Sequence, residues 1–319
     1  MENTQKNRLP KLSIVTPAYN EGKNLSGLYD RLKKNIGPLG ISWEWIVVDD
    51  HSNDNTYSVV AAMAQKDGRV RGIRLSRNFG SHLSIIGGLR FARGRAAIFL
   101  AADLQDPPEL IRDLLAKWKK GAHVVWCIRK NRKNESIISR ALAYSYYLLM
   151  RNFAGLKEMP PTGADFFLLD RKVLAALRGF GEKNPSLFAL ISWMGFKQET
   201  IIYDRQRRSF GRSKWTLKKK LKLVFDSVAA VSYAPMRLAF WLGLLLSLVG
   251  LMVLGFSFYL KKGFWGGVLV FLFGIELAML GIIGEYLWRV LDESRQRPPI
   301  FIEEMTRRHP RKPNHRGKD

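Results

Sequence analysis

The chain has 319 residues and a formal net charge of +25, from 52 Lys and Arg against 27 Asp and Glu. This length suits two domains, or one large domain with an appendage, and excludes a minimal single-motif peptide. The positive charge favours a polyanionic partner such as an anionic membrane, nucleic acid or a phosphorylated substrate. The single cysteine, Cys127, excludes an internal disulfide, and its apolar neighbours predict a buried, inert thiol.

Apolar runs typical of strands alternate with helix-like segments over the first 130 residues. The N-terminus is polar and shows no signal peptide, so we expect this part in the cytosol. The expected strands span 12–17, 43–50, 70–75, 96–103 and 123–128. The expected helices span 24–36, with Asn24 as a cap, then 56–68, 81–94 and 107–121. The alternation predicts an α/β fold with a mostly parallel sheet covered on both faces.

Polar and acidic residues stand where several of these strands end. The first strand is followed by Pro17-Ala18-Tyr19-Asn20-Glu21, the second ends in Asp49-Asp50, and the fourth ends in Asp103. Ligands of such sheets bind at the carboxyl ends of the strands, so we expect these residues to line a crevice. Asp49 and Asp50 can bond ribose hydroxyls or a base edge. A polar turn before a capped helix accounts for residues 54–56 but explains two acids at a strand end less well.

The fourth strand end also has the residues that a hard cation needs. Asp103 and Gln105 are two apart, so an extended segment would place both on one side, where a carboxylate and an amide oxygen could bind a metal. For Asp106, which precedes Pro107 and Pro108, we favour ordinary helix capping. Capping does not explain Asp103.

The C-terminal third contains two long apolar runs. Residues 238–260 carry no charge, and the run that starts at 265 carries only Glu276 up to residue 284. This pattern predicts two membrane spans, at about 238–260 and 265–287, within a 237–288 hairpin; a pair of buried core helices is the disfavoured alternative. The lysines and arginines that flank the pair predict that the catalytic part and both termini are cytoplasmic. For Glu276 we favour a contact with a neighbouring helix in an oligomer over a functional role.

The segments around the hairpin are basic. Residues 215–236 suit an amphipathic helix on an anionic membrane surface, with a linker helix packed on the catalytic domain as the alternative. Residues 289–319 read as a basic cytoplasmic tail, for which we favour a solvated segment near the membrane over a nucleic-acid binder. No nucleic-acid motif, P-loop or histidine cluster with metal-ligand spacing is present in the sequence.

Four segments, TPAYNEGKNL, VVDDHSNDNT, RNFG and ADLQDPPEL, closely resemble motifs of glycosyltransferase family 2 enzymes with the GT-A fold. Within that family, the chain looks like the polyprenyl-phosphate sugar transferases: the bacterial bactoprenol glucosyltransferases and the dolichyl-phosphate mannose synthases. The resemblance covers about residues 11 to 230, and the two C-terminal spans match the bacterial branch. It implies a Rossmann-like GT-A domain over residues 1–214.

The resemblance also implies roles for individual residues. The nucleotide-sugar pocket would contain Pro17, Tyr19, Glu21, Asp49, Asp50, Arg77 and Asn78. The metal, Mg²⁺ or Mn²⁺, would be held by Asp103 and Gln105 against the donor diphosphate. An acid near the reacting centre would be Asp165. The lipid phosphate and the diphosphate would be bound by Arg129, Arg140, Arg205, Arg208, Ser213 and Lys214, because an arginine fork pairs with two phosphate oxygens at once.

Two positions depart from the family pattern. Ala101 stands where relatives have the first acid of Asp-x-Asp-x-Gln, and Phe167 stands where many have arginine. The first departure suggests weaker metal binding, unless Asp103 and Gln105 suffice. The second departure bears on donor or acceptor specificity.

The expected activity is inverting transfer of a sugar to polyprenyl phosphate at the cytoplasmic face of the bacterial inner membrane, for cell-envelope glycosylation. The first expected donor is UDP-glucose, with another UDP-sugar or GDP-mannose as alternatives. A homo-oligomer through the spans is possible. A processive polysaccharide synthase is a second enzymatic alternative. It would need more membrane spans and usually has a Q-x-x-R-W motif, which the segment RSKW at 212–215 does not match. A membrane-anchored scaffold with a degenerate site is the alternative from another class.

Overall fold

A computed structural model describes the chain at residues 11–130, 148, 159–160, 164–180, 186–204, 241–243, 245–246, 248–249, 252, 256, 265–295 and 297–306. Its centre is an eight-stranded sheet with strand order β7-β5-β6-β4-β1-β2-β3-β8. The strands are β1 (Leu12–Ala18), β2 (Trp43–Asp49), β3 (Val70–Leu75), β4 (Ala96–Phe99), β5 (Val124–Arg129), β6 (Phe166–Asp170), β7 (Gln198–Tyr203) and β8 (Ile302–Met305).

The predicted α/β fold with a mostly parallel sheet is confirmed. Strand β1 pairs in parallel with β2 and β4, β2 with β3, and β5 with β7. Two strands run against this direction: β6 lies between β4 and β5, and β8 pairs with β3 at the edge. The sequence did not predict either of them.

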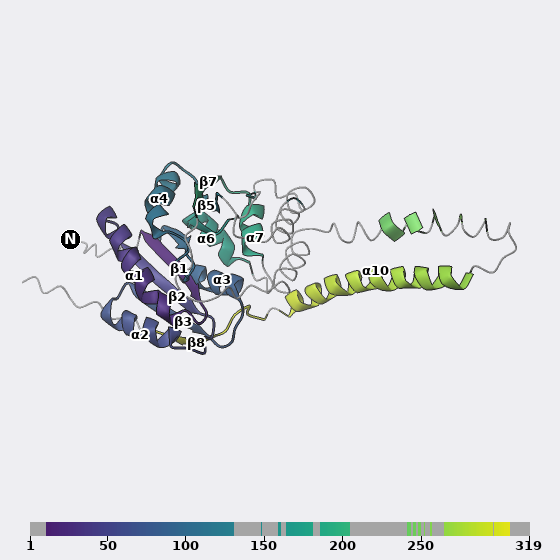
Figure 1. Cartoon of the computed structure of the whole chain (residues 1–319), viewed down its shortest axis with the longest axis horizontal. Helices are drawn as coiled ribbons and strands as arrows, with labels where there is room; N and C mark the ends of the chain where they lie inside the picture. Colours follow the sequence, from purple (N-terminus) through teal and green to yellow (C-terminus); the bar gives the residue numbers. More distant parts are fainter. Residues whose placement is uncertain are drawn as a thin grey trace, which may run out of the picture.

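Helices cover both faces of this sheet (Figure 1). The described helices are α1 (Gly22–Ile36), η1 (Gly37–Leu39), α2 (Thr56–Lys66), α3 (Ser81–Phe91), η2 (Pro108–Leu110), α4 (Ile111–Lys119), α6 (Arg171–Arg178), α7 (Leu187–Trp193) and α10 (Trp265–Ser294). Helix α1 packs between α2 and α4, whereas α3 packs on β1 and β2 beside α6. Because both faces are covered, all of β2 is buried, including the apolar run from Trp45 to Val48 and the charged residues Glu44 and Asp49.

Local sequence patterns explain where these elements form. Helix α1 buries Leu25, Leu28, Leu32 and Ile36, which recur at the spacing of one helix face. Asn24 is not its cap as predicted, because the helix already begins at Gly22 and the Asn24 amide donates to the Glu21 carboxylate. The fourth strand is also shorter than expected, since it ends at Phe99 and the chain then turns.

A close approach between helix and sheet depends on one glycine. A Cβ atom on Gly88 of α3 would lie 2.4 Å from Val15 Cγ1 of β1 and 2.9 Å from Val48 Cγ2 of β2. Those distances are shorter than van der Waals contact, so only glycine lets α3 rest directly on the two central strands.

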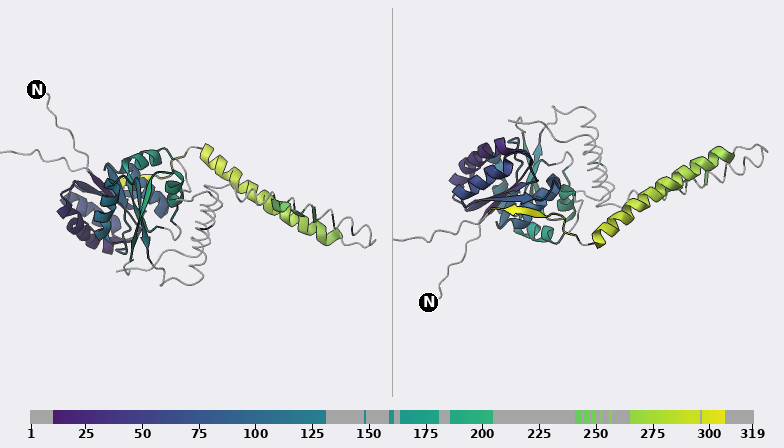
Figure 2. Two further views of the ribbon diagram at one scale, coloured as in Figure 1. Left: turned by 90° about the horizontal axis from the view of Figure 1, so that it is seen from above. Right: turned by 90° about the horizontal axis from the view of Figure 1, so that it is seen from below.

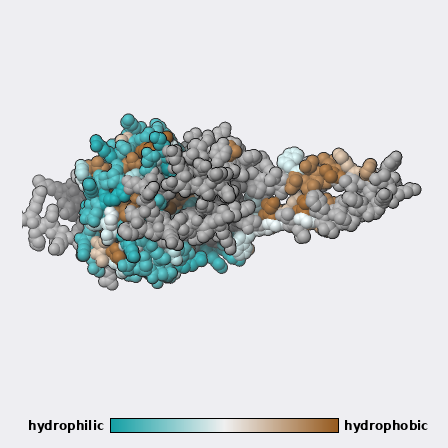
Figure 3. All heavy atoms as spheres, in the orientation of Figure 1, coloured by the Kyte–Doolittle hydropathy of each residue, from teal (hydrophilic) through white to brown (hydrophobic). Residues whose placement is uncertain are grey.

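The C-terminal region leaves the sheet and returns to it. Helix α10 projects away from the α/β domain (Figure 1), and large apolar side chains are exposed along it and along the described part of 241–256 (Figure 3). Within the described residues, no helix combines the length and hydropathy of a membrane span. The first expected span, 238–260, lies largely outside those residues. The expected tail is divided, because 289–294 belong to α10 and 302–305 form β8.

Candidate active site

The carboxyl ends of three adjacent strands share an unusual backbone feature. Asn20 after β1, His51 after β2 and Leu104 after β4 have φ angles of 54°, 59° and 62°, and no other non-glycine residue among those described has a positive φ. Side chains disfavour this left-handed region, so the surrounding contacts must hold it in place. Such backbone strain gathers at functional sites, which marks this edge of the sheet as the candidate site.

Hydrogen bonds fix the first two loops against each other. The Asn20 backbone N–H donates to Ser52 Oγ at 2.9 Å, and the Asn53 N–H donates to Asn20 Oδ1 at 2.9 Å. The Glu21 N–H donates to Thr56 Oγ1 at 2.9 Å. The loop with Tyr19 and Glu21 is therefore attached to the loop after Asp49. Asn20, which makes two of these bonds, was expected at the strand-end crevice but was given no role in the nucleotide pocket.

The adjacent acids Asp49 and Asp50 have different surroundings. Asp49 is fully buried; its Oδ1 accepts the Ser52 N–H at 3.1 Å, and its Oδ2 lies 3.4 Å from Arg74 Nη1. Asp50 accepts the backbone N–H of Phe79 at 2.7 Å and of Gly80 at 2.9 Å. Burial raises the pKa of the Asp50 carboxyl, and these N–H groups oppose that rise. Asp50 therefore shapes the loop after β3.

That loop contains two of the predicted site residues. Arg77 and Asn78 are exposed at the carboxyl end of β3, beside β2. The Arg77 guanidinium lies over the Phe79 ring, 4.5 Å from its centroid. Because Asp50 holds Phe79 and Gly80, its carboxylate positions the loop that presents Arg77 and Asn78.

Asp103 lies in a turn and not in an extended segment. Its Oδ1 accepts the Gln105 backbone N–H at 3.2 Å, across the left-handed Leu104. The premise that an extended backbone places Asp103 and Gln105 on the same side is therefore wrong. The Asp103 residue remains at the strand end, 7% exposed. Among the described residues, no group of three or more His, Cys, Asp or Glu side chains could hold a metal ion.

The loop that carries Asp103 is tied down to α1. Arg31 Nη2 donates to Glu109 Oε2 at 2.7 Å, and Arg31 Nη1 donates to the Leu104 carbonyl at 3.3 Å. The Asn35 amide also donates to Glu109, at 3.3 Å. These bonds restrain the turn from outside, so the position of Asp103 does not depend on the turn alone.

Asp106 and Asp165 meet at one tyrosine. The Tyr203 hydroxyl is 3.0 Å from Asp106 Oδ1 and 3.0 Å from Asp165 Oδ2. Asp165 also accepts two bonds from Arg129 Nε, at 3.0 and 3.1 Å, and a further bond from Nη2. The capping interpretation of Asp106 is wrong, because neither η2 nor α4 has a side-chain cap bond and Asp106 is 1% exposed. Arg129 and Asp165, which were expected separately at the lipid phosphate and near the reacting centre, are brought together.

A family model with the description "Glycosyl transferase family 2" matches residues 13–178, more than half of the chain. The chain belongs to glycosyl transferase family 2. It is therefore a glycosyltransferase, and the mostly parallel sheet with its strand-end site agrees with the GT-A fold that the motifs indicated.

Similar proteins match this glycosyltransferase over nearly its whole length. YkcC, an uncharacterised glycosyltransferase of Bacillus subtilis, is 38% identical over 91% of this chain and 93% of its own. A prophage bactoprenol glucosyl transferase homologue of Escherichia coli is 29% identical over 92% and 98%. The bactoprenol glucosyl transferase of Shigella phage SfV is 29% identical over the same shares. The resemblance to that group within family 2 is confirmed.

The family departure at Phe167 lies in the core of the glycosyltransferase. Phe167 is fully buried in β6, and its ring centroid lies 5.3 Å from that of Phe99, 5.5 Å from Trp126 and 5.6 Å from Phe188. An arginine in this place would bury a charge among rings. Phe167 therefore supports the sheet next to Asp165. Ala101, the other departure, follows β4 at the start of the Asp103 loop.

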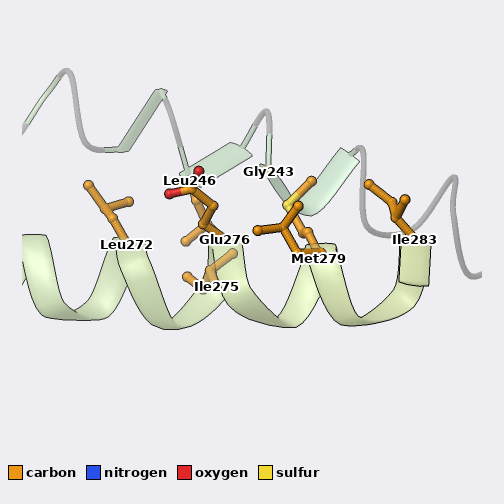
Figure 4. Close-up of a pocket in the computed structure, with 8 residues that line it drawn as sticks. Gly243, Leu246, Leu272, Ile275, Glu276, Met279 and Ile283 are labelled. Atoms are coloured by element: carbon orange, nitrogen blue, oxygen red, sulfur yellow. The ribbon is translucent and has the colours of Figure 1, made fainter. Parts of the chain in front are cut away.

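The remaining sequence predictions have mixed outcomes. Arg140, Arg205, Arg208, Ser213 and Lys214 lie outside the described residues. Cys127 is buried in β5 as predicted, and burial raises the pKa of its thiol. Glu276 of α10 lines a groove with Met279, opposite Gly243 and Leu246 (Figure 4), which places its carboxylate beside a neighbouring segment.

Proposed function

We propose that this glycosyltransferase moves a sugar from a nucleotide sugar, with UDP-glucose as the first donor to test, to a polyprenyl phosphate. The observation that carries the proposal is the match to proteins named bactoprenol glucosyl transferase over 92% of the chain, well beyond the family domain. The apolar C-terminal region is therefore shared with these relatives, along with the catalytic domain. A match limited to the family 2 domain would not have indicated which acceptor receives the sugar.

The donor would bind at the left-handed loops. Pro17, Tyr19, Glu21 and Asp49 would contact the nucleoside, and the exposed Arg77 and Asn78 would flank the sugar diphosphate. The support is the network that ties these loops together through Asn20, Ser52 and Thr56, since a rigid pocket costs less to order on binding. Asp50 would act one step away, by shaping the Arg77 loop.

A divalent cation, Mg²⁺ or Mn²⁺, suits the acid at the end of β4. Hard cations at phosphate sites often take one or two carboxylates and complete their ligands with substrate oxygens. Asp103 offers one carboxylate, oriented by the Gln105 N–H, and Gln105 offers an amide oxygen. These two side chains would supply only part of the ligand set, so the ion would arrive with the donor and take its remaining ligands from the diphosphate. When bound, such an ion stabilises negative charge on the departing diphosphate.

The acceptor phosphate would meet Arg129. The Arg129 side chain is 19% exposed, and its guanidinium is bonded to Asp165, which also contacts the Tyr203 hydroxyl. Arg140, Arg205, Arg208, Ser213 and Lys214 would complete the phosphate site. A phosphate oxygen is already anionic near neutral pH, so it can attack the anomeric carbon with inversion without a strong general base. Catalysis then rests on positioning and on electrostatic stabilisation of the leaving group.

Association with the bacterial inner membrane would bring enzyme and lipid acceptor together. Helix α10 exposes large apolar side chains such as Leu269, Phe273 and Leu287, at 52%, 61% and 63%. Contiguous apolar surface of this kind favours contact with lipid or with a second copy. We place the catalytic domain and both termini on the cytoplasmic side, with 215–236 on anionic lipid and the 237–288 region as the anchor.

The test uses the full-length protein in membranes with undecaprenyl phosphate and a panel of UDP-sugars and GDP-mannose. We expect a new polyprenyl-phosphate sugar by mass spectrometry, and nucleoside diphosphate in equal amount. Asp103→Asn should reduce the rate by about two orders of magnitude or more, as loss of a group that stabilises transition-state charge does. Asp113→Asn, the same change on the exposed face of α4, serves as the matched control and should be unaffected.

Two results would refute parts of the proposal. Normal turnover by Asp103→Asn would remove Asp103 from the site. Transfer of sugar only to a hydroxyl acceptor, and never to the lipid phosphate, would contradict the acceptor.

A further inference from the structure

The C-terminal strand β8 forms the edge of the sheet beside the donor site. It pairs antiparallel with β3, and Figure 2 shows it as the yellow arrow along that edge. Backbone bonds close both of its ends: Ser76 N–H to the Phe301 carbonyl at 3.0 Å, and Thr306 N–H to the Gly72 carbonyl at 3.0 Å. The chain thus returns from α10 to the strand that leads into the Arg77 loop.

A register shift in the pairing of β3 with β8 changes the direction of the Glu303 side chain. Arg74 is opposite Glu304 and Leu75 is opposite Ile302, so Glu303 is an extra residue in β8. An extra residue of this kind bends the strand and redirects a side chain. The Glu303 Oε2 atom accepts Arg74 Nε at 3.0 Å and lies 3.3 Å from His51 Nδ1. Glu303 therefore contacts one residue within β3, Arg74, and one residue that follows β2, His51.

Arg74 connects this acid to the expected nucleotide pocket. Its other nitrogens donate to Asp49 Oδ2 and to the Ser52 carbonyl, each at 3.4 Å. Its guanidinium lies over the Tyr57 ring, 5.8 Å from the centroid. Asp49 is fully buried, so Arg74 provides the positive charge next to an acid that has no access to water. Without the bond to Glu303, Arg74 would keep its bonds only to Asp49 and Ser52, so its guanidinium would spend less time beside the Asp49 carboxylate.

We propose that Glu303 is a positioning residue for nucleotide binding, acting through Arg74 on Asp49 and Ser52. The inference rests on the proposed function, because it takes Asp49 as part of the nucleotide pocket. Ser52 Oγ also accepts the Asn20 N–H at 2.9 Å, so the same contact extends to the loop of Tyr19 and Glu21. Donor affinity then depends on whether the C-terminal strand is seated on the sheet.

The experiment measures nucleotide binding by the purified full-length protein. UDP and GDP, each with Mn²⁺, are titrated by calorimetry into wild type and Glu303→Gln. We expect about two- to fivefold weaker binding of the preferred nucleotide, because a half-exposed ion pair has a modest effect. In the transfer assay, the KM for the nucleotide sugar should rise by the same factor, while kcat and the KM for the lipid should not change.

A matched control comes from the opposite end of the sheet. Glu199 pairs with Lys117 at 2.9 Å, and its side chain is 44% exposed against 47% for Glu303. Glu199→Gln removes the same charge from a similarly exposed glutamate in an ion pair, and the variant should bind UDP as wild type does. Arg74→Gln should weaken binding by itself, and Glu303→Gln added to it should have no further effect, because the two residues act as one unit.

The outcomes separate the inference from the proposed function. Equal affinity in wild type and Glu303→Gln, an equal loss in Glu199→Gln, or full additivity with Arg74→Gln would overturn the inference. A wild type that binds neither UDP nor GDP would overturn the nucleotide site as well. Binding of UDP without glycolipid formation would contradict only the acceptor. If Glu303→Gln does not fold, Glu303→Asp, with its shorter side chain, should show the same selective loss.

Discussion

The Tyr203 hydroxyl connects two acids of the candidate site. The Tyr203 hydroxyl is 3.0 Å from both Asp106 and Asp165, yet it has a single hydrogen to donate. It can satisfy one carboxylate at a time as a donor, so the two acids are coupled through it. Because Asp165 orients Arg129, a change at Tyr203 should reach the guanidinium that we assign to the acceptor phosphate.

Removal of that hydroxyl should therefore affect both stability and turnover. Tyr203→Phe takes a donor away from two buried acids, and we expect about 1–3 kcal/mol lower free energy of unfolding. We also expect a several-fold lower kcat as Arg129 loses its fixed orientation. Urea denaturation and initial rates of transfer measure the two effects.

Tyr29→Phe provides the comparison for Tyr203→Phe. The Tyr29 hydroxyl also donates to a carboxylate, that of Asp67, but this contact lies before the start of β3 and away from the carboxyl ends of the strands. The variant should lose stability without loss of kcat. If both variants lowered kcat equally, the effect would be one of stability, and Tyr203 would have no particular role in the site.

At the candidate site, sequence reasoning could predict the location of residues that stand at the end of an apolar run. Asp49 ends β2, and Asp50 and Asp103 follow strands, so their place at the carboxyl edge could be predicted. Asp106 and Tyr203 are 97 residues apart, and their contact depends on how β4, β6 and β7 are ordered in the sheet. No local pattern records such a contact, which is why Asp106 was assigned to capping.

At the scale of elements, the fit between α3 and the sheet decides the geometry near the Arg77 loop. Gly88 lets the helix rest on Val15 and Val48 of the two central strands. The loop held by Asp50 leads directly into α3, so a displaced helix would also shift Phe79 and Gly80.

Gly88→Ala should consequently destabilise the protein despite alanine's better helix propensity. The overlap with Val15 and Val48 costs about 1–3 kcal/mol, against a gain of about 0.5–1 kcal/mol from the helix backbone. We expect a lower urea midpoint with an unchanged slope. Gly68→Ala is the control, since a Cβ atom there meets nothing within 4 Å. An equal midpoint for both variants would show that the α3 contact can relax.

Elements with a clear period could be predicted, and those defined by partners could not. The alternation of strand and helix through β5 follows from local apolar patterns, and the structure confirms it. Strand β6 pairs antiparallel with β4 and β5, and β8 pairs with β3 at the edge of the sheet, so both are defined by contacts with strands distant in the sequence. Ile302–Met305 includes two glutamates and would be read as a polar tail without that edge.

For the whole molecule, the net charge of +25 should tie activity to the lipid surface. Each cation near an anionic bilayer contributes about 1 kcal/mol of attraction. We expect a several-fold lower KM for polyprenyl phosphate in vesicles with phosphatidylglycerol than in phosphatidylcholine alone. The difference should shrink as salt rises from about 0.1 M to about 1 M, where the Debye length falls from about 10 Å to about 3 Å.

Nucleotide binding measured without vesicles is the control, because no lipid is present. It shows how much of the salt effect arises at the nucleotide site and not at the lipid surface. Equal KM values in both kinds of vesicle would show that the basic residues do not recruit the enzyme to its acceptor.

The thiol of Cys127 can report local opening of the sheet. Cys127 is buried in β5, and its carbonyl accepts the backbone N–H of Asp165, the acid that orients Arg129, at 2.9 Å. A maleimide reagent can reach that sulfur only while the strand is transiently exposed. The speed of its modification therefore reads out how often this end of the sheet opens, with no label to engineer and no competing site in the chain.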